Sequence, residues 1–204
     1  MSELRPEIVN RRARRGLAHT AVPREVLNRL AEAATLAPSC FNNQPWRLVF
    51  VTEPDERGVV HRALAGGNYW AERAPAYVVV VTHPDLDCRL DEDRDYALFD
   101  TGLAVENLVL QATHEGLIAH PIAGFHAAQL KQGLGIPPEY VAITVVVLGY
   151  PGDSSDLTER HRALEAAPRS RVPISEVVWF NRWEGPPDES AVSNRTGVLQ
   201  GRRG

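Results

Sequence analysis

The sequence predicts an α/β protein in which helices cover both faces of a short sheet. Residues 76–82 include four consecutive valines, and residues 141–149 form a second run rich in valine and isoleucine. β-Branched runs without polar alternation are typical of strands buried on both faces. Helical segments at 23–37 and 96–115 carry the apolar side chains needed to cover such strands.

Each helical segment has recognisable ends. Pro23 suits the first helical turn, and Pro38 should stop the same helix because its ring clashes with the preceding turn. Its apolar residues recur at helical spacing at Val26, Leu27, Leu30, Ala34 and Ala37. The segment 96–115 is apolar around most of its circumference and ends at Gly116, so we expect burial on all sides, partly against a second subunit.

The remaining elements follow from local composition. They are a strand at 47–52, a helix at 55–64 ended by Gly66-Gly67, an exposed acidic loop at 83–95, a turn at 120–125, a helix at 125–134 and a strand at 172–183. Residues 1–184 are expected to form one domain. Residues 185–204 read as a polar tail that is flexible or packed on a partner subunit.

Composition excludes several classes of protein. The net charge of −4 gives no general attraction to nucleic acid, and no long uncharged apolar run predicts a membrane span. The N-terminus lacks an apolar signal-peptide core, so we expect a cytoplasmic protein. No Cys/His spacing resembles a zinc site. Glycine-rich nucleotide loops and a nucleophile elbow are also missing, which argues against dinucleotide Rossmann domains, NTPases and α/β-hydrolases.

The stretch 37–47 reads Ala-Pro-Ser-Cys-Phe-Asn-Asn-Gln-Pro-Trp-Arg and is called the signature loop below. It concentrates three side-chain amides and a hydroxyl between Pro38 and Pro45, which stiffen both ends. Such a loop suits a planar polar ligand. Cys40 is interpreted as a passive loop residue; it could pair with Cys88, the other cysteine, but nothing in the sequence requires a disulfide.

Two basic clusters are candidates for anion binding. Arg11, Arg12, Arg14 and Arg15 form the first, and Arg169 with Arg171 the second. Guanidinium groups match phosphate oxygens bidentately, but taken alone the first cluster is interpreted first as the charged face of a solvated first helix. His114 and His120 flank a predicted helix end and are interpreted as surface or capping residues.

Together these motifs resemble the nitroreductase family of FMN-dependent oxidoreductases, over roughly residues 11–183. The signature loop matches the family pattern Ala-Pro-Ser-x-x-Asn-x-Gln-Pro-Trp at every fixed position. Arg11-Arg12-Ala13-Arg14-Arg15 matches Arg-Arg-Ser-x-Arg except that Ala13 replaces the serine. Further matches follow in family order at 67–69, 107–112, 116–117, 121–125, 148–151 and 169–171.

The resemblance implies a three-layer sandwich with a short mixed sheet flanked by helices, in an intertwined homodimer. It also implies FMN as cofactor, with NADH or NADPH as co-substrate and a nitroaromatic, quinone or related small-molecule acceptor. No protein nucleophile or base is then required, because the flavin carries the electron chemistry. The family's flavin contacts fall at Arg11, Arg12, Ala13, Arg15, Pro38, Ser39, Asn42, Gln44, Asn68, Pro121, Ile122, Ala123, Gly124, Arg169 and Arg171.

Within that set, the resemblance implies distinct roles. The arginines would hold the phosphate, Ser39 and Asn42 would reach the flavin of the partner subunit, and the Ala123 backbone N–H would lie near flavin N5. Two alternatives stay open: a flavin dehydrogenase or dehalogenase dedicated to one metabolite, and a flavin-binding protein without enzymatic activity. In the family, segments over the open flavin face decide the acceptor, and the resemblance gives residues 83–99 and the tail as the candidates here. Tyr96 and Phe99 are candidates for this lid, although they are interpreted first as core or interface residues.

Overall fold

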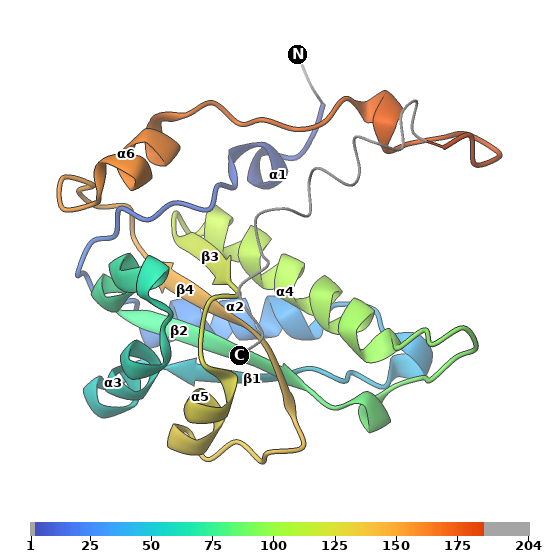
Figure 1. Cartoon of the computed structure of the whole chain (residues 1–204), viewed down its shortest axis with the longest axis horizontal. Helices are drawn as coiled ribbons and strands as arrows, with labels where there is room; N and C mark the ends of the chain where they lie inside the picture. Colours follow the sequence, from blue (N-terminus) through green and yellow to red (C-terminus); the bar gives the residue numbers. More distant parts are fainter. Residues whose placement is uncertain (1–2, 186–204) are drawn as a thin grey trace. The chain divides into compact units, whose positions relative to one another are not determined.

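A computed structural model describes residues 3–185 of the chain, so most of the predicted tail at 185–204 lies outside the described residues. The chain divides after Ala166 into two units. The first unit carries the sheet and most of the helices, whose arrangement is shown in Figure 1. Within the described residues, no helix is both long and apolar enough to cross a membrane.

The first unit is built on four strands in the order β1-β2-β4-β3. The strands are β1 (Arg47–Val51), β2 (Ala76–Thr82), β3 (Ile118–Ile122) and β4 (Val141–Gly149). Every neighbouring pair is antiparallel, so the sheet is not mixed as the family resemblance implied. The central strands β2 and β4 are the two apolar runs predicted from sequence.

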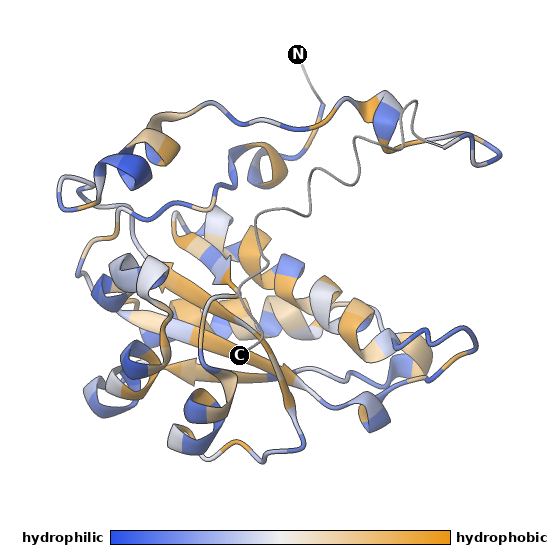
Figure 2. Ribbon diagram, in the orientation of Figure 1, coloured by the Kyte–Doolittle hydropathy of each residue, from blue (hydrophilic) through white to orange (hydrophobic). Residues whose placement is uncertain are grey.

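Helices cover both faces of the sheet, as predicted. The helices of this unit are α1 (Pro6–Asn10), α2 (Arg24–Thr35), α3 (Pro54–Ala63), α4 (Tyr96–His114), α5 (Ala127–Gly133) and α6 (Glu159–Ala166), of which α1 and α6 contain no buried residue. Val78 and Val80 of β2 face α2 and α4, whereas Val79 and Val81 belong to the cluster that includes α3 and α5. Apolar residues accordingly line the strands and the helix faces turned toward them (Figure 2).

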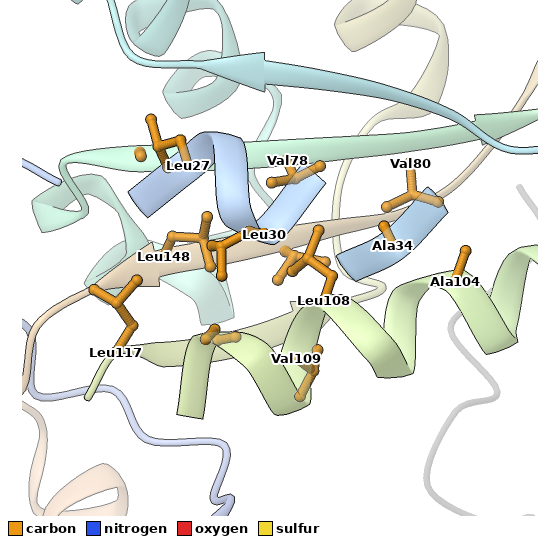
Figure 3. Packing of buried hydrophobic residues seen from close by; sticks show 14 of the residues in the cluster. Leu27, Leu30, Ala34, Val78, Val80, Ala104, Leu108, Val109, Leu117 and Leu148 are labelled. Carbon is orange, nitrogen blue, oxygen red and sulfur yellow. The ribbon is translucent and has the colours of Figure 1, made fainter. Parts of the chain in front are cut away.

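The contact between α2 and α4 forms the core of one face (Figure 3). Leu30 and Leu108 are completely buried there, together with Ala34 and Ala104. The Arg29 guanidinium, in the middle of α2, donates to both carboxylate oxygens of Glu115, the residue that follows α4, at 2.7 Å. This pairing holds the pKa of Glu115 well below its usual range, at about 2.

α4 is not buried all round within one chain. Leu98 and Phe99, on its first two turns, are 50% and 57% exposed. The prediction of burial on all sides was therefore wrong for a single subunit. Burial of these side chains against a second subunit stays a prediction.

Three other local predictions were wrong. The segment 120–125 begins within strand β3 instead of forming a turn; β3 lies at the edge of the sheet, where the missing N–H of Pro121 is tolerated. Gly66 opens a 3₁₀ segment, Gly66–Arg73, rather than ending α3. The predicted strand at 172–183 contains only the short 3₁₀ turn Ile174–Glu176, because its exposed valines have no neighbouring strand among the described residues.

Candidate functional site

The signature loop has an unusual backbone. Phe41, Asn42 and Gln44 all have positive φ angles, of 47°, 61° and 50°. Non-glycine residues rarely adopt this region, and each such residue costs on the order of 1 kcal/mol or more. Such a conformation persists only where the surroundings fix it, so the loop is a preformed surface rather than a relaxed connection.

Hydrogen bonds within the signature loop and to β2 help to hold its backbone in this conformation. The backbone N–H of Gln44 donates to Ser39 Oγ at 3.0 Å, and that of Asn42 donates to the Ser39 carbonyl at 3.0 Å. Thr82, at the end of β2, donates through its hydroxyl to the Pro45 carbonyl at 3.0 Å. Ser39 thus organises the loop besides any contact that it makes with a ligand.

Cys40 is not a passive residue, because it forms a disulfide with Cys88 across 48 residues of sequence. The bond ties the signature loop to the acidic loop at 83–95. Asn43 adds a second tie, since its side-chain amide donates to Asp87 Oδ1 at 3.1 Å. Sequence reasoning left this pairing open because cysteine spacing alone does not show which loops meet.

A buried carboxylate supports the same loop from α4. Asp100 is 1% exposed, and its Oδ2 accepts the backbone N–H of Cys40 at 2.7 Å. Burial raises the pKa of Asp100, and the neighbouring Asp87 carboxyl raises it further, while the Cys40 N–H opposes the shift. Asp100 was missed from sequence because an acid in an apolar helix pattern gives no sign of which backbone group it meets.

The first basic cluster does not lie on a helix. α1 ends at Asn10, and Arg11–Arg15 follow in an irregular segment called the arginine segment below. This segment is fixed by a bridge between Leu17 and Pro151 and by the Arg15 backbone N–H, which donates to Glu165 at 2.7 Å. The solvated-helix interpretation was therefore wrong, and the guanidinium groups stand on an anchored loop.

The arginine segment meets two other predicted site regions through an aromatic stack. The Arg15 guanidinium lies over the Trp70 ring, 5.7 Å from its centroid, and Trp70 stacks on His120 at 4.6 Å. His120 in turn lies 2.9 Å, through Nδ1, from the Arg14 carbonyl. Trp70 was not singled out from sequence, although its place next to Asn68-Tyr69 offered a signal.

His120 is buried, at 8% exposed, so its interpretation as a surface residue was wrong; His114 is exposed as predicted. A carbonyl oxygen only accepts, so Nδ1 of His120 carries a proton and donates to Arg14. Burial lowers the pKa of His120 to about 4, with Arg15 and Arg11 contributing and the Arg14 carbonyl opposing the shift. The ring is therefore neutral at physiological pH, which leaves the positive charge of this region on the arginines.

This buried histidine should make stability depend on pH. The unfolded chain takes up a proton on His120 near pH 6.5, whereas the folded protein resists protonation until about pH 4. The contribution of His120 to the free energy of unfolding is therefore greatest above pH 6.5. It decreases by about 3 kcal/mol in total as the pH falls to about 4. His120→Asn, whose amide can still donate to Arg14, should flatten that part of the profile in chemical denaturation. His19→Asn, at an exposed position, is the control; equal profiles for the two variants would contradict the assignment.

Asn68 and Gly124 are also brought together. The Asn68 side-chain amide donates to the Gly124 carbonyl at 2.8 Å, and the Ala65 backbone N–H donates to the same oxygen at 2.9 Å. A Cβ on Gly124 would lie 2.7 Å from Asn68 Nδ2. Only glycine allows this close approach, which places the segment 121–124 against the 3₁₀ segment that carries Asn68.

Gly124→Ala should therefore move the Asn68 amide and break its hydrogen bond. We expect the free energy of unfolding to decrease by about 1–2 kcal/mol, measured by urea denaturation. Gly102→Ala, in α4 where a Cβ meets nothing within 4 Å, is the matched control and should be neutral or stabilising. Equal stability of the two variants would show that Asn68 is not constrained in this way.

The arginine segment and the signature loop thus lie at opposite ends of β4, whereas Pro121 and Ile122 pair with Val146 and Val145 near the middle of that strand. The arginine segment reaches the sheet at Pro151, just beyond the last residue of β4, whereas Pro45 lies against Thr82, which pairs with the first residue, Val141. Nine residues of strand span about 27 Å from first to last. Arg169 and Arg171 belong to the second unit, and their role as phosphate ligands stays a prediction.

Comparison of the sequence with known protein families identifies the family of this chain. Residues 8–65 and 53–150 match the model of the Nitroreductase family. The chain belongs to the nitroreductase family. The matched residues take in the arginine segment, the signature loop, Asn68 and the segment 121–124, but not Arg169 and Arg171.

Individual members of the nitroreductase family are similar over most of their length. The NADH dehydrogenase of Thermus thermophilus is 28% identical over 202 residues, covering 83% of this chain and 92% of that protein. The FMN reductase [NAD(P)H] of Bacillus subtilis is 23% identical, covering 76% of this chain and 68% of that protein. A crystal structure described as an oxidoreductase containing FMN superposes with a TM-score of 0.79 at 29% identity, covering 91% of this chain and 96% of the other. The three-layer nitroreductase fold is thereby confirmed.

Proposed function

We propose that this protein binds FMN at a site shared by two subunits and uses NADH or NADPH to reduce a nitroaromatic, quinone or related small molecule. The coarser function, an FMN-dependent NAD(P)H oxidoreductase, is supported by family membership and by the names of the relatives. The observation that carries the finer proposal is the convergence of the arginine segment, Asn68 and the end of β3.

The arginine segment supplies the charge that an FMN phosphate requires. The anchored loop carries Arg11, Arg12 and Arg15. The adjacent His120 is neutral near pH 7, so the charge of this region does not change with pH in that range. Ala13 lacks the hydroxyl of the family's serine, a loss of about 1 kcal/mol that several charge-assisted hydrogen bonds outweigh. Arg169 and Arg171 are proposed to complete this set.

The flavin ring and ribityl chain would lie along the close approach of Asn68 and Gly124. The missing side chain at Gly124 lets the Asn68 amide pack against the backbone there, and Pro121, an exposed residue of the edge strand β3, borders the same segment. Ile122 and Ala123 complete the segment. These residues fit FMN because they offer amide and backbone groups for the flavin ring and ribityl chain, and arginines for the phosphate. When bound, FMN would supply the redox chemistry, and the protein holds and orients it.

The signature loop is proposed to act on the FMN of a second subunit. Within one chain, Pro38, Ser39, Asn42 and Gln44 lie at the end of the sheet remote from the arginine segment. Phe41, at the tip of the loop, is 90% exposed, and the nearby start of α4 exposes Leu98 and Phe99. Large apolar side chains that are exposed beside a preformed polar loop are typical of an interface. A homodimer would cover them and complete both sites.

The identity of the pigment and its reduction test this proposal. The purified protein should be yellow, and the flavin released by denaturation should have the mass of FMN. Under anaerobic conditions, NADH or NADPH should bleach the visible flavin band. Absence of FMN, or bound FMN that neither nucleotide reduces, would refute the proposal; the second result would favour a flavin-binding protein without this activity.

A further inference from the structure

The Cys40–Cys88 disulfide lies where it can control the proposed cofactor site. Cys40 directly follows Ser39 and precedes the strained residues Phe41 and Asn42, while Cys88 lies in the acidic loop. The chain contains no other cysteine. Any thiol–disulfide chemistry of this protein therefore acts on the signature loop.

Besides its internal hydrogen bonds and the bond from Thr82 to Pro45, the loop is held near Cys40 by two further contacts, both non-covalent. Cys40 donates through its backbone N–H to Asp100, and Asn43 donates through its side chain to Asp87. The Asp87 Oδ2 atom is buried and has no hydrogen-bond partner among the described residues. Two carboxyl groups packed against each other at this point repel one another when ionised, and burial raises the pKa of Asp100. Without the covalent bond, these contacts hold the strained loop less securely.

Both sulfur atoms belong to partly exposed residues, so a thiol in solution can reach the bond. The Asn43 amide lies 3.6 Å from Cys88 Sγ and donates toward it. Such a donor favours Cys88 as the leaving thiolate when a reductant attacks Cys40. In reducing compartments, disulfides are typically transient, catalytic or redox-sensing.

We infer that Cys40–Cys88 is a redox-modification site for dithiol reductants, and that its reduction loosens the signature loop and weakens FMN binding. In this reaction the dithiol loses two electrons and two protons and becomes a disulfide. The Cys40–Cys88 bond breaks, and each cysteine gains one hydrogen. An oxidised disulfide reverses the exchange. The coupling to FMN rests on the proposed function, whereas the loosening of the loop does not.

The effect of reduction on FMN affinity depends on the fraction of protein molecules whose signature loop is in the binding conformation. If reduction leaves about one loop in ten in the binding conformation, the apparent dissociation constant of FMN increases about tenfold. Cys88→Ser should behave like the reduced protein with or without reductant. The reduced wild-type protein, alkylated with iodoacetamide, gives the same comparison without a substitution.

The test compares oxidised, reduced and alkylated apoprotein, with Cys88→Ser as the insensitive control. Reduction with dithiothreitol, later removed by gel filtration in EDTA, should release two thiols. Hydrogen exchange should accelerate over residues 39–44 and not over the central strands β2 and β4, and FMN should bind about tenfold more weakly.

Each contrary result overturns a defined part of the inference. Two free thiols in air-oxidised protein would overturn the modification site itself. Unchanged exchange at 39–44 on reduction would overturn the loosening of the loop. Faster exchange with unchanged FMN affinity would overturn its coupling to the cofactor. If the oxidised protein binds no FMN at all, the proposed function fails with that coupling, and the exchange data still decide whether the disulfide locks the loop.

Discussion

Cys88→Ser is expected to lower the free energy of unfolding by about 4 kcal/mol. The disulfide closes a segment of 48 residues, and restricting the unfolded chain over such a length stabilises the folded state by about this amount. Small domains are stable by only about 5–15 kcal/mol, so the variant should unfold at much lower denaturant concentration. Urea denaturation monitored by circular dichroism measures the difference.

The wild-type protein supplies its own control for this change. After reduction, its unfolding midpoint should coincide with that of Cys88→Ser, and reductant should not affect the variant. Because the two cysteines of the chain are paired with each other, no other disulfide contributes to the difference between reduced and oxidised protein. Oxidised wild type and variant that differ by less than about 1 kcal/mol would show that the bond does not form or constrains little.

Arg11→Ala is expected to weaken FMN binding by roughly 10- to 100-fold. A charge-assisted hydrogen bond to a phosphate is worth about 1.5–3 kcal/mol when partly desolvated, and Arg11 stands on the anchored segment beside the neutral His120. Arg11→Lys should fall between the variant and wild type, because lysine keeps the charge and loses the bidentate geometry. Fluorescence titration of apoprotein with FMN gives each affinity.

Two controls separate phosphate binding from a general effect. Arg24→Ala removes the same charge from the exposed start of α2 and should leave FMN affinity unchanged. Riboflavin, which lacks the phosphate, should bind Arg11→Ala as well as it binds wild type. Equal losses for FMN and riboflavin would mean that the substitution disturbs the site rather than removing a phosphate ligand.

The sequence was most informative about the apolar elements. Uninterrupted valine runs predicted β2 and β4 within the observed bounds, and helical spacing predicted α2 and α4 to within two residues. Those patterns exist because both faces of the sheet are covered. β3 was missed because an edge strand tolerates Pro121, so its local composition looks like a turn.

Prediction of the site was limited by contacts between distant residues. The arginine segment and the signature loop were found from composition, since charge and amides concentrate there. Asp100, Trp70 and the partner of Cys40 were not, because their roles arise from contacts between residues 48 or more positions apart in the sequence. No local pattern encodes such a contact. The strained backbone of Phe41 was equally invisible, since its cause lies in the surrounding loops.

FMN content of a mixed dimer tests the shared site most directly. Chains carrying Arg11→Ala and chains carrying Asn42→Ala, with different affinity tags, are co-expressed, and the doubly tagged dimer is isolated. If each site combines the arginine segment of one subunit with the signature loop of the other, the mixed dimer has one intact site and one doubly altered site. We predict that it retains tightly bound FMN at half the wild-type content, while both variant homodimers are depleted. A mixed dimer as depleted as the homodimers would contradict a site shared between subunits.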